Sequence, residues 1–335
     1  MKKNQTKLQI QCVAYAVLIL LFAASCNSDD DESLLGNWKD RSVFDGTPRS
    51  NAVAFTIGNM GYMGTGYDGD DYLKDFWAYD IDGNFWSQLS DFPGVERNAA
   101  VAFAVNNRGY VGTGFDGDVE LNDFYSYDVA TNTWNQIADF EGSQRRSAVA
   151  FSSNSAGYLG TGFDGDNDKK DFWRYSPDND TWTELSGYGG SKRRDAAVFK
   201  IDNKVYLGTG VSNGFLQNDF WEFNLSNESW RELIEIDDDD ENEFILRSGA
   251  TGFTIGNRGY LACGNDGGGP SPRVWEYDPI SDTWDEKTSL EKTSRQDAIA
   301  FSNGQRSFIA LGRNGNLYLD DNFEFFPQEE EDEDD

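Results

Sequence analysis

Apolar and polar positions alternate in short runs along almost the whole chain after Ser33. In residues 51–86 four such runs follow one another, passing through Ala54, Tyr62, Trp77 and Trp86. Clusters of Gly, Asp and Asn separate the runs, as is typical of tight turns between β-strands. No stretch outside the signal-like N-terminus keeps an apolar period of about 3.6 residues. The pattern therefore predicts an all-β protein.

The four runs recur as six copies. Each copy opens on a Phe, and the interval between successive copies is constant except for the fourth, which contains an acidic insertion at residues 237–243. Four strands in ~48 residues are typical of a propeller blade, so the repeat predicts a six-bladed β-propeller. The leading residues are Phe55, Phe103, Phe151, Phe199, Phe253 and Phe301. An arginine stands at the same distance ahead of each: Arg49, Arg97, Arg145, Arg193, Arg247 and Arg295.

The two ends of the chain are predicted to share one blade. The last copy, which begins at Phe301, supplies three strand patterns but no final Trp strand. Residues 37–44 match the missing strand, with Trp38 in the position of the repeated Trp. We therefore expect the N-terminal strand to complete the last blade, which closes the ring and covers sheet edges that would otherwise promote aggregation.

These copies resemble the kelch repeat, which has paired small residues after a Tyr, an aromatic cluster about a dozen residues later and then a Trp. The resemblance covers residues 34–327 and implies a kelch-type propeller there, followed by an acidic C-terminal tail at 328–335. Kelch adaptor domains that bind acidic peptides use arginines at positions like those ahead of each copy. The resemblance therefore implies recognition of an anion.

The N-terminus has the features of a bacterial lipoprotein. Residues 1–25 combine a basic start with a short apolar run, and the sequence LFAASC resembles a lipobox, which predicts a signal peptide and lipidation of Cys26. Residues 26–33 form an acidic tether that resembles the surface-export tract of Bacteroidetes lipoproteins. We expect a surface-exposed lipoprotein of the outer membrane. An ordinary cleaved signal peptide and a merely solvated spacer are the alternatives.

Charge narrows the possible partners. The chain has 28 basic and 59 acidic residues, a net charge of −31, which becomes −34 once the lysines of residues 1–25 are removed. Nucleic-acid binding is excluded because contacts with phosphates need clustered Lys and Arg. We expect a monomer that reaches the membrane through its lipid anchor only. Cys263 is the one cysteine left after Cys12 and Cys26, so no intramolecular disulfide is expected.

The chain carries no recognisable catalytic signature. Copper radical oxidases share the kelch fold, but they need histidine ligands and this chain has no His. A sialic acid epimerase of bacteria is also a six-bladed kelch protein, so a carbohydrate-active isomerase remains an alternative, with catalytic residues unknown. We expect no cofactor and no metal. The repeated Asp-Gly-Asp turns suit either calcium or an ordinary β-turn.

The arginines ahead of each copy allow two interpretations, either a structural ring paired with the acidic turns or a ligand site around the channel mouth. The first three blades contain many turn acids, whereas the turns of blades four to six lose most of them, and Arg273 and Arg313 lie nearby. Functional sites are expected where a repeat breaks its own pattern. The candidate ligand-binding residues are Arg193, Arg194, Arg247, Arg295, Asp195 and Asp297.

The function predicted from these features is a surface-anchored binding propeller that recognises an anionic glycan or a protein partner through its top face. We define the top face as the one that carries the connections between blades. A sialic acid epimerase-type enzyme and a structural subunit of a surface complex are the two alternatives, because a propeller fold does not determine function.

Overall fold

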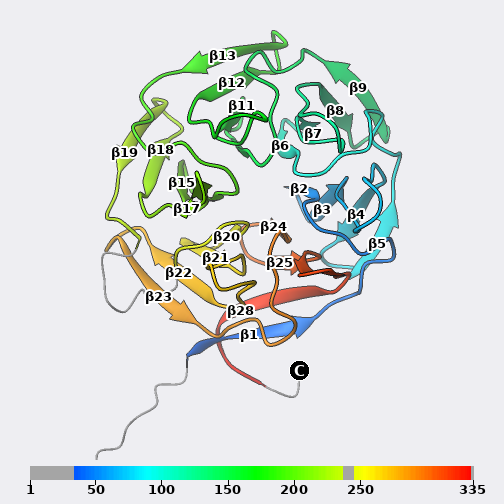
Figure 1. Ribbon diagram of the computed structural model, residues 1–335. Helices are drawn as coiled ribbons and strands as arrows, with labels where there is room; N and C mark the ends of the chain where they lie inside the picture. Colours follow the sequence, from blue (N-terminus) through cyan, green and yellow to red (C-terminus); the bar gives the residue numbers. More distant parts are fainter. Residues whose placement is uncertain (1–33, 237–244, 333–335) are drawn as a thin grey trace, which may run out of the picture. The chain divides into compact units, whose positions relative to one another are not determined.

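The computed structural model describes residues 34–236 and 245–332. In these ranges the chain forms six four-stranded antiparallel sheets around a central axis (Figure 1). The predicted six-bladed propeller is therefore confirmed. Among the described residues, no helix has the length and apolar character needed to cross a membrane. Cys26 and the acidic insertion at 237–243 lie outside the described residues.

The first five blades each take four strands in chain order. The first blade consists of β2 (Val53–Ile57), β3 (Met60–Gly64), β4 (Phe76–Asp80) and β5 (Phe85–Gln88). The second consists of β6 (Val101–Val105), β7 (Arg108–Gly112), β8 (Phe124–Asp128) and β9 (Thr133–Ile137). The third consists of β10 (Val149–Ser152), β11 (Gly157–Gly160), β12 (Phe172–Ser176) and β13 (Thr181–Leu185).

The fourth and fifth blades follow the same order. The fourth consists of β14 (Ala197–Ile201), β15 (Lys204–Gly208), β18 (Trp221–Asn224) and β19 (Ser229–Glu232). The fifth consists of β20 (Thr251–Ile255), β21 (Arg258–Ala262), β22 (Val274–Asp278) and β23 (Thr283–Lys287). Two small hairpins extend turns of the fourth and sixth blades: β16 (Val211–Ser212) with β17 (Phe215–Leu216), and β26 (Arg313–Asn314) with β27 (Leu317–Tyr318).

The sixth blade joins the two ends of the chain. It consists of β24 (Ile299–Ser302), β25 (Ser307–Ala310), β28 (Asn322–Glu330) and β1 (Leu35–Asp40). Strand β1 pairs antiparallel with β28, and Trp38 lies opposite Phe325 with the two ring centroids 4.5 Å apart. Figure 1 shows the two strands side by side, β1 in blue and β28 in red. The predicted closure by the N-terminal strand is confirmed.

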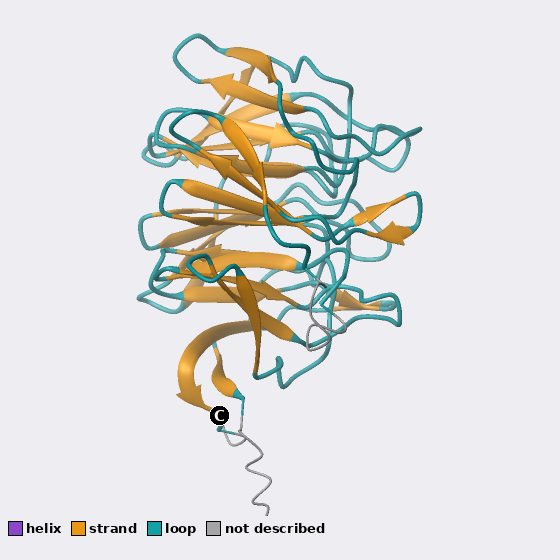
Figure 2. Ribbon diagram, turned by 90° about the vertical axis from the view of Figure 1, so that its left-hand side faces the viewer, coloured by secondary structure: helices purple, strands orange, loops and turns teal. Residues whose placement is uncertain are grey.

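The connections define two different faces. Loops that lead from the outermost strand of one blade to the innermost strand of the next lie beside the turns between the second and third strands, as shown by the bridges Ser50–Tyr67, Asn98–Phe115 and Arg146–Phe163. This is the top face. Its hairpins β16–β17 and β26–β27 extend to the right in Figure 2. The opposite face, with the turns that join the first strand to the second and the third to the fourth, is called the bottom face.

Aromatic side chains fill the wedges between blades. Phe55 stacks on Tyr62 in its own blade at 5.1 Å, and Tyr62 contacts Tyr127 of the next blade at 6.1 Å. A Cβ added to Gly109 in the second blade would collide with the Phe55 ring. At Gly109 there is no room for a side chain because the aromatic ring of the preceding blade lies directly on the backbone, whereas the fourth and sixth blades carry Val205 and Ser307 at this position.

Candidate functional site

The arginine ring is buried. All six side chains are 0% exposed. In five blades the guanidinium binds an aspartate that lies just ahead of the third strand, at the same sequence spacing in every pair. The pairs are Arg49–Asp75, Arg97–Asp123, Arg145–Asp171, Arg193–Asp219 and Arg295–Asp321.

Arg145 illustrates how each ion pair holds its blade together. Its Nε donates to the Ser143 carbonyl at 3.0 Å, Nη1 donates to the Thr161 carbonyl at 2.8 Å, and both terminal nitrogens donate to the Asp171 carboxylate at 2.8 Å. The guanidinium also lies 4.8 Å from the centroid of the Phe140 ring. Burial opposes ionisation of Asp171, but Arg145 outweighs it and holds the pKa of this carboxyl below 3.8. The arginine thus joins three separate segments of the blade.

The ring arginines of blades four and six keep a carboxylate partner, although the turns of these blades lose most of their acids. Arg193 binds Asp219 and Arg295 binds Asp321. Sequence reasoning missed both aspartates because it searched the turns, whereas the acid sits at a constant spacing beside the third strand. That constant spacing was present in the sequence and would have identified them.

Arg247 differs because Arg273 occupies the position of the aspartate. The Arg247 guanidinium donates to the backbone carbonyls of Ile245, Cys263 and Arg273 at 2.9, 2.7 and 3.1 Å. Burial lowers the pKa of Arg247 to about 10. Arg193, Arg247 and Arg295 are all fully buried, so these three candidate residues present no side-chain surface on the top face.

The channel mouth is formed by the residues two positions after each ring arginine. Each has a positive φ, and each backbone N–H donates to the carbonyl of the equivalent residue in the preceding blade at 2.9–3.1 Å, so that six hydrogen bonds close a ring. Their side chains line a cavity of about 170 Å³. The six residues are Asn51, Ala99, Ser147, Asp195, Gly249 and Asp297.

Two carboxylates stand at this mouth, as the sequence predicted. Asp195 and Asp297 flank Gly249, and Asp297 reaches across the space that a side chain at Gly249 would fill. Burial raises the pKa of Asp195 to about 6, and the charge of Asp297 adds to the effect. Asp297 accepts a hydrogen bond from Arg313 Nε at 2.9 Å, which supplies its countercharge.

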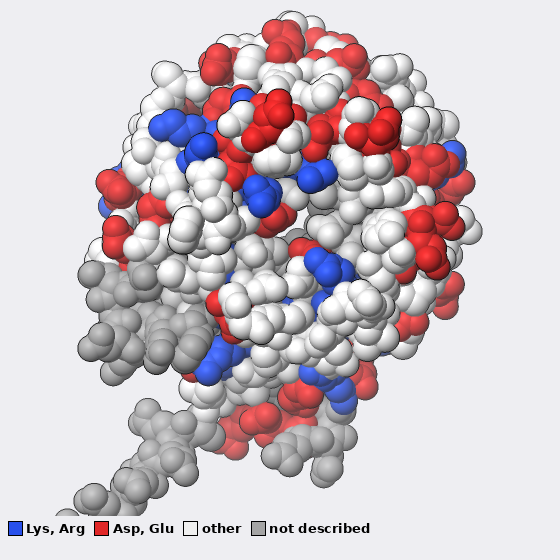
Figure 3. Space-filling model, in the orientation of Figure 1, with Lys and Arg blue, Asp and Glu red and all other residues white. Residues whose placement is uncertain are grey.

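The accessible cations of the mouth are Arg146, Arg194 and Arg313, whose side chains are 33%, 31% and 33% exposed. In Figure 3 blue side chains surround a hollow at the centre of the top face. The candidate set included Arg194, and Arg313 was noted as a neighbour, but Arg146 was missed. Arg146 could have been identified from the Arg-Arg pair at 145–146, which recurs at 193–194. In each pair the first arginine is buried and the second faces outward.

Aromatic rings hold two of these arginines. Arg146 lies 4.4 Å from the Phe115 ring centroid and 5.3 Å from that of Phe163, and Arg194 lies 5.0 Å from Phe163 on the neighbouring turn. Each also contacts one buried acid: Arg146 binds Glu120 at 3.1 Å and Arg194 binds Asp168 at 2.6 Å. Phenylalanine and guanidinium planes therefore alternate along this side of the mouth.

The Asp-Gly-Asp turns use their first aspartate internally. Asp68 Oδ1 accepts hydrogen bonds from the backbone N–H groups of Asp70 and Asp71 at 2.9 and 2.8 Å. Asp116 and Asp164 do the same in the next two blades. The geometry is that of a side-chain-capped turn.

Comparisons with known proteins support the architecture. A model described as the kelch motif matches residues 97–141, which contain all four strands of the second blade and parts of its flanking loops. A solved structure described as "Structure of YjhT" is similar over 84% of this chain and 96% of its own length, with a TM-score of 0.72 and 16% sequence identity. No curated protein matches the chain. At this identity the likeness shows the fold alone, a kelch-motif propeller of six blades.

Proposed function

We propose that this protein is a binding propeller that recognises an anionic glycan or a protein partner through the mouth of its top face. The proposal rests on one observation: three partly exposed arginines surround a single opening, although the chain as a whole has a net charge of −31. They are Arg146, Arg194 and Arg313. Kelch propellers commonly serve as binding scaffolds, and the top-face loops are the part that varies between blades.

The chemistry of the three arginines favours an acidic group. A guanidinium presents five N–H donors in a planar fork that fits a carboxylate or sulfate with two parallel hydrogen bonds. Among the described residues, Arg146 uses a single ion-pair contact, to Glu120, and Arg313 donates mainly to Asp297. Donors therefore remain on both side chains. Stacking on Phe115 and Phe163 fixes the plane of Arg146 before a ligand arrives, which lowers the entropy lost on binding.

A glycan screen tests the proposal. The protein lacking residues 1–33, which retains every strand of the propeller, is applied to carboxylated, sulfated and neutral glycans at two salt concentrations. We expect binding of acidic glycans only, weakened by salt because exposed charges are screened over ~8 Å at physiological ionic strength. A parallel arm offers acidic peptides. Equal binding of neutral and acidic glycans contradicts the proposal.

Single substitutions locate the site. Arg146→Ala, Arg194→Ala and Arg313→Ala should each weaken the interaction by about tenfold, the loss of one charge-assisted hydrogen bond. Arg108→Ala is the matched control, because Arg108 is 44% exposed, carries one ion pair to Asp128 and begins strand β7 at the bottom face. If Arg108→Ala weakens binding as much as the three mouth variants, the ligand is not held at the mouth.

One observation favours an enzyme as the second candidate. Asp195 has a pKa of about 6 and lies beside Asp297, so it exchanges a proton near neutral pH, as a general acid–base requires. A sugar-acid isomerase would use this pair. Incubation with sugar acids followed by NMR, with Asp195→Asn as the inactive control, separates this candidate from simple binding.

We also propose that the propeller is anchored to the cell surface through lipid on Cys26. The supports are the lipobox-like sequence and the acidic tether in residues 26–33. Cys26→Ala should abolish incorporation of labelled fatty acid. A variant with neutral residues in place of the acids of the tether should still be lipidated but should no longer be exposed on the cell surface. If protease still removes this variant from whole cells, the tether has no role in export.

A further inference from the structure

Small residues recur at two positions along the channel wall. The residue three positions after the ring arginine stands immediately ahead of the innermost strand of each blade, and in all six blades it is alanine. Seven positions after the arginine, near the bottom face, the residues are Thr56, Ala104, Ser152, Lys200, Thr254 and Ser302. Blade four therefore places a lysine where every other blade has a small or hydroxyl-bearing residue.

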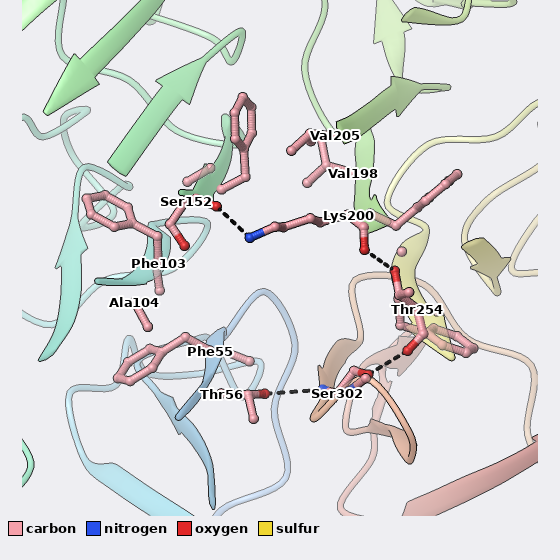
Figure 4. Close-up of a pocket in the computed structure, with 18 residues that line it drawn as sticks. Phe55, Thr56, Phe103, Ala104, Ser152, Val198, Lys200, Val205, Thr254 and Ser302 are labelled. Carbon is pink, nitrogen blue, oxygen red and sulfur yellow. Dashed lines mark hydrogen bonds between the residues drawn. The ribbon is translucent and has the colours of Figure 1, made fainter. Parts of the chain in front are cut away.

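Lys200 stands in a cavity of about 410 Å³ at this lower end of the channel. Figure 4 shows its side chain crossing the cavity from β14, with Nζ 3.2 Å from the backbone carbonyl of Ser152 in the neighbouring blade. None of the residues that line the cavity is acidic. The ammonium thus has a neutral partner, although the chain carries 59 acidic residues.

Burial lowers the pKa of Lys200, and no charged neighbour contributes to the shift. The Lys200 side chain is exposed within the channel and, among the described residues, its ammonium makes no ion pair, so an anion in the cavity can bind it through a charge-assisted hydrogen bond. The two protons of Nζ that do not face Ser152 remain available to such an anion.

Hydroxyl groups on the same wall are held in fixed positions. Thr254 Oγ1 donates to the Lys200 carbonyl at 2.8 Å, and Ser302 Oγ donates to the Thr254 carbonyl at 2.6 Å. Thr56 Oγ1 accepts from the Ser302 N–H at 3.1 Å, so its own proton is free to donate into the cavity. The Ser152 hydroxyl makes no hydrogen bond to another described residue. The wall therefore offers one cation and two hydroxyl donors, with alanine and phenylalanine side chains between them.

We propose that the lower end of the channel is a second binding site, which takes a small organic monoanion through its carboxylate. Lys200 binds the carboxylate, and Thr56 and Ser152 donate to it or to neighbouring oxygens. The volume suits a molecule about the size of a monosaccharide acid. A single lysine neutralises a single negative charge, so monoanions are favoured over dianions. The site shares no residue with the arginine mouth on the top face.

Titration calorimetry and ligand-observed NMR with the whole protein test this inference, using glucuronate, glucose and inorganic phosphate as probes. We expect glucuronate to bind in the millimolar range or tighter, glucose not to bind, and phosphate to bind more weakly because part of it is divalent at neutral pH. Failure of glucuronate to bind overturns the proposal. Equal binding of phosphate overturns the preference for a monoanionic carboxylate.

Substitutions at Lys200 test whether glucuronate binds at the lower end of the channel. Lys200→Ser should weaken glucuronate binding by at least tenfold, and the fold should tolerate it because Ser152 and Ser302 occupy the same position in two other blades. Lys200→Arg should retain binding. Lys204→Ser, which removes a lysine of the same blade that is paired with Glu222, should leave it unchanged, and because the channel site shares no residue with the arginine mouth, a loss seen only in Lys200→Ser separates this site from the top-face proposal. Unaltered glucuronate affinity in a Lys200→Ser protein with wild-type Tm shows that the ligand is bound elsewhere.

Discussion

Replacing Asp171 with asparagine isolates one ion pair of the arginine ring. The substitution keeps the shape of the side chain and removes its charge, so Arg145 stays buried with only neutral hydrogen-bond acceptors. We expect a loss of stability larger than that caused by any exposed acid-to-amide change, because a buried guanidinium without its countercharge carries an uncompensated desolvation cost.

The magnitude follows from the burial of the pair. Breaking a fully buried ion pair costs ~3–5 kcal/mol. Arg145 is 0% exposed but Asp171 is 22% exposed, so water reaches one side of the pair and reduces the expected cost to ~2–4 kcal/mol. For a domain of about 300 residues this corresponds to a decrease in Tm of roughly 3–6 °C.

Thermal and denaturant unfolding measure the effect, with Asp166→Asn as the control, since Asp166 is exposed in the same blade. The pKa of Asp171 lies below 3.8 in the folded protein, so its contribution to stability is present above about pH 4 and is lost as pH falls through the lowered pKa. The wild type and Asp171→Asn should therefore converge in acid. A Tm for Asp171→Asn within error of the Asp166→Asn value at pH 7 would refute the scaffolding role of the ring.

Three further predictions concern closure, the channel mouth and the wedge between blades. Trp38→Ala should cost ~3–5 kcal/mol in denaturant unfolding, because the Trp38 ring is 2% exposed and packs on Phe325 across the closing strands, and an unchanged midpoint would show that β1 is dispensable. Asp195→Asn should raise the free energy of unfolding by ~1–3 kcal/mol above pH 6 and leave it unchanged below pH 4. The reason is that the pKa of Asp195 is raised from 3.8 to about 6, so the folded protein is destabilised only at a pH where Asp195 is ionised. A stability gain that does not depend on pH would contradict this. Gly157→Ala should lower Tm by several degrees, since the new Cβ meets the Phe103 ring, and a stable variant would mean that the wedge relaxes freely.

The sequence alone determined the blade count, the strand order and the closure. These features depend on local signals: alternation with a period of two, turn residues between runs and a repeat of nearly constant length. The missing Trp strand of the last copy and the matching Trp38 were sufficient to predict that β1 pairs with β28. Asp195 and Asp297 were also candidates from the sequence alone, because they follow ring arginines by two residues in blades whose turns lose most of their acids.

Only the tertiary structure decided which arginines are buried and which face the solvent. Arg145 and Arg146 are adjacent and chemically identical, yet one is 0% exposed within its blade and the other is 33% exposed at the mouth. The two residues lie in the loop ahead of β10, where Arg145 turns toward Asp171 inside the blade and Arg146 turns toward Glu120 and Phe115 at the mouth, and only the assembled ring brings these partners together. The same reason hid Lys200, whose position in the channel exists only when six innermost strands surround a common axis.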